Sequence, residues 1–122
     1  MKPVILFAIG IAVVAACVMP ALASETTKTI KGEVIDLECS LSQGAAGSGE
    51  SHGACAMRCA REGKQMAILT GDQVYLVEGD YTANKNAKLL DFVAKQVEAK
   101  GAVSERDGKA MINVAAMRVV KP

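Results

Sequence analysis

The chain has 122 residues, a length that suits one domain preceded by a short leader. Apolar residues make up 51% of it, which indicates a folded core and argues against disorder. Aromatic residues make up only 3% and the formal net charge is +1, so no nucleic-acid partner is expected, whether through base stacking or through the phosphate backbone. Four cysteines and a single histidine carry most of the remaining information about function.

The first 23 residues have the pattern of a secretory signal peptide. Lys2 precedes an apolar run over Val4–Val18, which is shorter than the roughly 20 residues that a membrane-spanning helix needs. Ala21–Ala23 then forms a small-residue cleavage site. We therefore expect residues 1–23 to be removed and residues 24–122 to form a single domain, periplasmic or secreted.

A second interpretation of the leader is a lipoprotein signal. Val14–Cys17 resembles a bacterial lipobox, and cleavage before Cys17 would leave a lipid-anchored protein. The apolar residues that follow, 18–23, favour soluble export, because a lipoprotein usually becomes polar soon after its cysteine. A membrane contact is expected only if Cys17 carries the lipid.

Five short strands and two helices are predicted in the rest of the chain. Alternating apolar residues indicate strands over 29–37, 66–69, 74–77, 96–105 and 111–120. Gly32 is expected to mark a bulge or a bend in the first strand. Residues 40–51 are rich in glycine and serine and predict a flexible loop, whereas 51–62 and 86–95 predict helices.

This order of elements predicts a mainly β fold. It is typical of a small five-stranded OB-like barrel with a second helix between strands 3 and 4. The additional element is a Cys/His helix inserted between strands 1 and 2, where such barrels often bind their ligands.

Three cysteines and the only histidine have the spacing of a metal site. His52, Cys55 and Cys59 fall within about 60° of one helix face, because each residue turns a helix by about 100°. Cys39 lies just past the end of the first strand, before the glycine-rich loop, and could fold back to meet them. Three thiolates and one imidazole suit a tetrahedral Zn or Cu(I) ion. We therefore predict one transition-metal ion bound by Cys39, His52, Cys55 and Cys59.

Other interpretations of these residues stay open. In an oxidising compartment Cys39 could form a disulfide with Cys55 or Cys59, which leaves one thiol unexplained. A thiol redox protein is a third possibility, with Cys55 near a helix start as its reactive residue. Asp36 could accept a hydrogen bond from a metal-bound side chain, although its place in the sequence favours a solvated strand residue.

The sequence gives little support to an enzyme. It contains no Cys-x-x-Cys dithiol, no haem-attachment motif, no phosphate-binding loop and no hydrolase signature. A metal ion with four protein ligands has no open position for water, which favours a structural or carrier role over hydrolysis. The leading expectation is a small exported metal-binding module. The alternative is a disulfide-stapled domain that binds a ligand or another periplasmic protein.

A resemblance supports the position of the site. The pattern Gly32-x-Val34-x-Asp36-x-x-Cys39, followed by His52-x-x-Cys55-Ala56-x-x-Cys59, is similar to a group of small uncharacterised exported bacterial proteins with an OB-like barrel and a C…HxxCxxxC motif. The resemblance extends through Gly63, an apolar hairpin and Gly101-x-Val103, and so covers nearly all of the mature chain. It implies the barrel fold and the location of the Cys/His site, but no activity.

Overall fold

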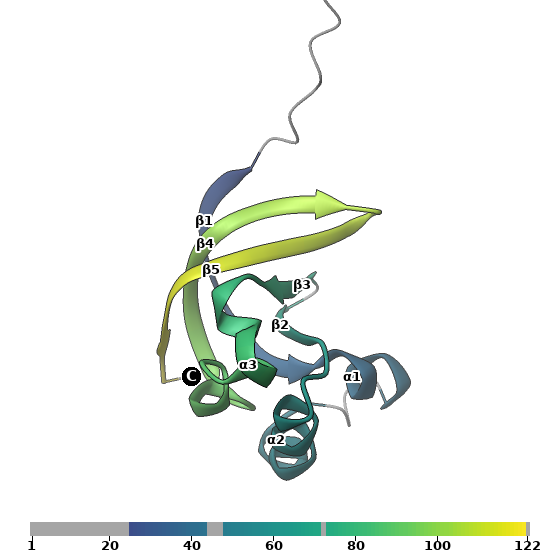
Figure 1. The fold of residues 1–122 in the computed structure, drawn as a ribbon. Coiled ribbons are helices and arrows are strands. Elements are labelled where there is room, and N and C mark those ends of the chain that lie inside the picture. The colour runs from purple at the N-terminus through teal and green to yellow at the C-terminus, as the bar shows by residue number, and fades with distance from the viewer. Residues whose placement is uncertain (1–24, 44–47, 72, 122) are drawn as a thin grey trace, which may run out of the picture.

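A computed structural model describes residues 25–43, 48–71 and 73–121 (Figure 1). The predicted leader and Cys17 lie outside the described residues. In the described part of the chain, no helix is both long and apolar enough to cross a membrane.

The described chain forms a closed five-stranded barrel. Its strand order is β1-β2-β3-β5-β4, and β4 pairs back with β1 to close it. Neighbouring strands are antiparallel except β3 and β5, which run parallel. This arrangement confirms the predicted mainly β, OB-like barrel. The strands are β1 (Thr26–Asp36), β2 (Met66–Thr70), β3 (Gln73–Glu78), β4 (Gln96–Arg106) and β5 (Lys109–Val119).

Apolar side chains from all five strands fill the barrel interior, as their alternation predicts. Met66 is fully buried among them and Met57 packs against them, so both methionines serve as core residues. The buried cluster consists of Ile30, Val34, Ala56, Ala60, Met66, Ile68, Val77, Leu89, Val93, Val97, Ala99, Ile112 and Val114.

Gly32 lies where β1 and β2 approach each other closely. Its pairing with Val97 is regular, and the register shift that the strands do contain lies between Lys100 and Gly101. Of the two expectations for Gly32, a bulge or a bend, the bulge is therefore wrong. A β carbon at Gly32 would collide with the carbonyl oxygen of Leu69, so only glycine lets β1 and β2 approach this closely.

The connection between β1 and β2 is helical and lies at the end of the barrel where β1 finishes (Figure 1). It contains α1 (Leu37–Gln43), a 3₁₀ helix (Glu50–His52) and α2 (Gly53–Arg61). The predicted Cys/His helix is confirmed as α2, but the loop expected from residue 40 is wrong because α1 extends to Gln43. The helix begins there because Oδ1 of Asp36 accepts the backbone N–H of Glu38 at 2.9 Å and so caps its first turn.

The predicted continuous helix over 86–95 is also wrong. The connection between β3 and β4 consists of a 3₁₀ helix (Asp80–Thr82), the short α3 (Ala83–Asn86) and a second 3₁₀ helix (Leu90–Phe92). Asn84, Lys85 and Asn86 have left-handed φ angles of 52°, 55° and 60°, which a right-handed helix cannot include. The apolar residues of this segment are buried from short turns rather than from one helix face.

Candidate metal centre

Five potential ligands meet where β1 passes into its helical connection. Asp36 is the last residue of β1, and Cys39 lies in the first turn of α1. His52 ends the 3₁₀ helix, and the last two ligands, Cys55 and Cys59, lie on α2. Their four-residue separation places the two cysteines on the same side of that helix.

The ligand atoms form two overlapping groups. The histidine group consists of Cys39, His52 and Cys55, whose ligand atoms all lie within 4.8 Å of one another. The aspartate group consists of Asp36, Cys39 and Cys59, which meet the same limit. The thiol of Cys39 belongs to both. The structure thus contains Cys/His and Cys/Asp groups that could hold a metal ion.

Each group contains a buried polar atom that lacks a hydrogen bond. Asp36 is 0% exposed and its Oδ2 has no hydrogen-bond partner in the described structure. His52 is 8% exposed, and its Nε2 has none among the same residues. Because buried polar atoms are nearly always paired, two such atoms beside thiols are candidate metal ligands.

In the aspartate group, the carboxyl group and the two thiols shift one another's pKa values. Burial by itself raises the pKa of Asp36, but the thiols of Cys59 and Cys39 and the backbone amides of α1 outweigh it, and the net pKa is lowered. Oδ2 has no hydrogen bond to these thiols in the described structure, yet their proximity favours the charged form of the carboxyl group. The carboxylate is therefore ionised at neutral pH.

The pKa values of the Cys39 and Cys59 thiols are raised, whereas that of Asp36 is lowered. Burial and the neighbouring Asp36 raise the pKa of Cys39 to about 11, and the Asp36 carboxylate followed by burial raises that of Cys59 to about 12. Both thiols are thus protonated at neutral pH in the absence of a cation. A metal ion reverses this preference, because its positive charge stabilises thiolates.

The residues around the groups fix the two segments that carry them. Both carboxylate oxygens of Glu33 accept the N–H of Gly49, whose carbonyl accepts the N–H of His52 at 3.1 Å. On α1, Glu38 forms an ion pair with Lys64 at 3.1 Å, and this pair links α1 to the residues that follow α2.

The buried Asn86 fixes the other end of α2. Its side-chain amide donates to the carbonyls of Ala60 and Lys64, at 3.0 and 2.9 Å. The carbonyl of Ala60 also accepts the backbone N–H of Gly63, so the amide adds a second hydrogen bond there and supplies a donor to the part-buried carbonyl of Lys64. It thereby holds the helix that carries Cys55 and Cys59.

The structure brings the four predicted ligands and Asp36 near one another, but it divides them into two groups instead of the single set of four that the sequence predicts. Cys39, His52 and Cys55 form one group, and Cys59 lies beside Cys39 in the other. All three described cysteines are free thiols. The expectation that Asp36 is a solvated strand residue is wrong, because the side chain is completely buried and faces the thiols. A sequence signal existed: Asp36 follows the apolar pair Val34-Ile35 and precedes Cys39 by three residues.

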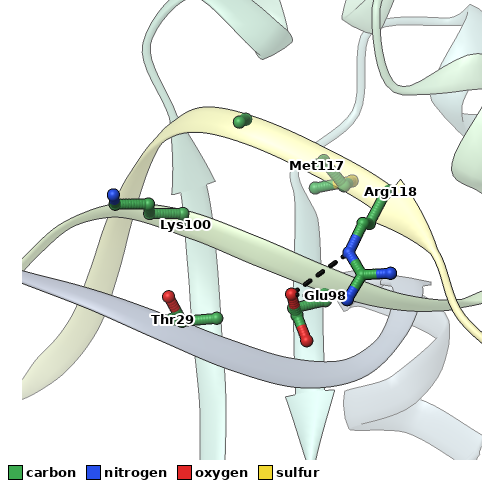
Figure 2. Close-up of a pocket in the computed structure, with 6 residues that line it drawn as sticks. Thr29, Glu98, Lys100, Met117 and Arg118 are labelled. Atoms are coloured by element: carbon green, nitrogen blue, oxygen red, sulfur yellow. Dashed lines mark hydrogen bonds and ion pairs between the residues drawn. The ribbon is translucent and has the colours of Figure 1, made fainter.

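A pocket on the outer face of the barrel has a different chemistry. Its volume is about 240 Å³, and Figure 2 shows Arg118 reaching from β5 to Glu98 on β4. The Arg118 guanidinium donates to one Glu98 oxygen at 2.9 and 3.1 Å. The pair is exposed to solvent, so it contributes at most about 1 kcal/mol to stability. Neither cysteine nor histidine lines this pocket.

The fold and the site together define a small OB-like barrel with a thiol-rich cluster in the connection between β1 and β2. Comparisons with protein families, curated proteins and solved structures find no match to this chain. The function is therefore inferred from the chemistry of the cluster.

Proposed function

We propose that this protein is an exported metal-binding module that holds a transition-metal ion of the Zn(II) or Cu(I) type. The observation that carries the proposal is the histidine group, in which two thiols and an imidazole from three separate helices converge within 4.8 Å. The unpaired, buried Nε2 of His52 adds to it. Thiolate and imidazole are the side-chain donors that both ions prefer.

The role we propose is structural or that of a carrier. The ion would join α1 to α2, so part of its binding free energy would stabilise the folded chain. A thiol redox activity would have to rest on Cys55 alone, because reactive cysteines have lowered pKa values whereas those of Cys39 and Cys59 are raised. We assign no catalytic reaction to the cluster.

The proposed location is the periplasm or the cell exterior. It rests on the predicted leader and on its Ala21–Ala23 cleavage site. A carrier there would exchange its ion with another periplasmic protein. Intact-mass measurement tests the location: a chain that begins at Ser24 supports soluble export, whereas a diacylated chain that begins at Cys17 indicates a lipid anchor.

The experiment that tests the function is metal binding by the reduced protein and its single variants. We expect Cys39→Ser and Cys55→Ser to weaken Zn(II) binding at least tenfold and to abolish most of the rise in melting temperature that zinc produces. We expect His52→Ala to have a smaller effect of the same sign, because water can replace an imidazole ligand. Ser42→Ala is the matched control, because its exposed hydroxyl on α1 faces only the carbonyl of Cys39.

A second candidate function is a disulfide-stapled interaction domain without metal. It is favoured by the thiol of Cys39, which lies within 4.8 Å of the thiols of both Cys55 and Cys59. Counting free thiols in the protein as isolated separates the two functions. One free thiol among the three, no bound metal and a silent His52→Ala variant would reject the metal-binding module. Three free thiols with bound metal would reject the staple.

A further inference from the structure

The starting observation is that the ligand atoms form two groups rather than one. Zn(II) binds sulfur at about 2.3 Å and nitrogen or oxygen at about 2.0–2.2 Å, so all ligands of one ion lie within about 4.6 Å of one another. The ligand atoms of the histidine group, and likewise those of the aspartate group, lie within 4.8 Å of one another, close to this limit, and the two groups share only Cys39. One ion therefore does not reach all five donors in this arrangement.

Each group also has its own evidence for a missing partner. In the histidine group it is Nε2 of His52, and in the aspartate group it is Oδ2 of Asp36. Both residues are more than nine-tenths buried. An ion in the histidine group alone would leave Oδ2 of Asp36, which is completely buried, without a partner. An isolated buried carboxylate is costly unless it is paired or coordinates a metal.

We propose that the cluster is a binuclear centre, with one divalent ion in the histidine group and a second in the aspartate group, bridged by the thiolate of Cys39. The inference rests on the proposed metal-binding function and extends it to the number and the class of ions. Thiolate sulfur has several lone pairs, so it can bind two ions at once.

Charge balance selects divalent ions. The three thiolates and the carboxylate carry four negative charges when metal is bound, and two divalent ions neutralise them. Two Cu(I) ions would leave two negative charges in a largely buried site, which is unfavourable. Carboxylate oxygen is moreover a ligand for Zn(II), whereas Cu(I) prefers sulfur. Zn(II) is therefore the ion that fits both groups.

The test is the number of zinc ions that each chain holds. The protein as the cell processes it is reduced, stripped of metal, loaded with excess Zn(II) and separated from free ions, and bound zinc is then counted by elemental analysis and native mass spectrometry. Two ions per chain is the expected result. One ion overturns the binuclear centre and indicates a single site with Cys59 turned toward the histidine group. No bound zinc contradicts the proposed function as well.

Variants assign each ion to its group. Asp36→Asn keeps an oxygen that can accept the N–H of Glu38, so α1 is preserved while the anionic ligand is lost. We expect it to reduce bound zinc from two ions per chain to one by removing the ion of the aspartate group. We expect His52→Ala to give the same number by removing the ion of the histidine group. Cys39→Ser should reduce it below one. The control is Asp91→Asn, an exposed carboxylate in the Leu90–Phe92 helix, which should leave two ions.

Cobalt tests the bridge itself and does not depend on any variant folding. A first Co(II) ion should give a paramagnetic resonance signal, and a second should reduce the signal per chain because two ions joined by one sulfur couple antiferromagnetically. A signal that grows in proportion up to two ions would overturn the shared Cys39 ligand. Should Asp36→Asn fail to fold, as judged by circular dichroism, Cys59→Ser removes the second ion by the same logic and takes its place.

Discussion

Glu33 accepts the backbone N–H of Gly49 with both of its carboxylate oxygens, at 3.1 and 2.9 Å. Glu33 lies on β1 and Gly49 precedes the 3₁₀ helix that ends at His52. Through Glu33, β1 thus holds the segment that carries His52. Three residues further along the same strand lies Asp36. The ligands on both sides of the cluster are positioned by β1.

The first prediction concerns this anchor. We expect Glu33→Ala to weaken zinc binding to the histidine group by about fivefold, because a hydrogen bond of this kind is worth about 1 kcal/mol and His52 must then be ordered by the ion. Glu33→Gln keeps one acceptor oxygen and should restore part of the affinity. Isothermal titration measures both.

A double variant separates positioning from general stability. In a His52→Ala background, Glu33→Ala should have little further effect on zinc affinity, since the side chain that it positions is gone. Equal losses in both backgrounds would contradict a role through His52. Glu98→Ala removes a glutamate from the outer barrel face and serves as the control that leaves zinc affinity unchanged.

The second prediction is an acid-side loss of stability that depends on Asp36. Its pKa is lower in the folded protein than its ordinary value of 3.8, so the unfolded chain binds more protons as the pH falls. The stability that the charged carboxylate contributes is present above that value and is lost as the pH falls through the folded pKa. Urea unfolding of metal-free protein should therefore show an advantage over Asp36→Asn that holds at neutral pH and shrinks as the pH falls below 3.8. A constant difference would contradict the prediction.

The third prediction is an alkaline loss of stability that depends on two thiols. Their pKa values, about 11 for Cys39 and about 12 for Cys59, lie above the ordinary 9.0. Between pH 9 and these values the folded chain holds protons that the unfolded chain has released, so the free energy of unfolding falls as pH rises. Denaturant titrations from pH 8 to pH 11, on reduced metal-free protein, measure the slope. Cys59→Ala should make it shallower, and an unchanged slope would count against the coupling to Asp36.

The fourth prediction concerns Asn86, which caps α2. We expect Asn86→Ala to destabilise the fold by about 1–3 kcal/mol, because the carbonyls of Ala60 and Lys64 lose the amide that joins them and alanine tolerates the left-handed backbone poorly. Asn84→Ala is the matched control: it has a similar φ angle, but its side chain is exposed. The excess cost at Asn86 over Asn84, from thermal or chemical unfolding, measures the cap alone. Equal costs would contradict it.

The strands could be predicted because their signal is local. Alternating residues such as Ile112 and Val114 on β5 direct every second side chain into the barrel, and this periodicity is visible without knowledge of the partner strand. The helix over 86–95 was mispredicted for the opposite reason. Leu89 and Val93 have helical spacing, but Asn86 must reach the end of α2, and the left-handed residues that bring it there break the helix.

The cluster was only partly predictable for a similar reason. Helical spacing alone indicated His52, Cys55 and Cys59, and the residue types indicated Cys39. The burial of Asp36 depends on α1, which is too short and too polar to give a periodic signal and forms because Asp36 itself caps it. The division of the ligands into two groups depends on where α1 lies relative to α2, and a sequence contains that information only through tertiary packing.

The topology also has a consequence for the order of folding. The ligands lie between β1 and β2, which are consecutive antiparallel strands, so the cluster depends on contacts that are close in sequence. Barrel closure instead needs β1 to find β4, with Thr26 opposite Val103, and contacts this distant form slowly. On the proposed metal-binding function, an unfolded chain would capture metal in a β1–β2 unit before the barrel closes, and the loaded unit would be the nucleus on which the later strands assemble.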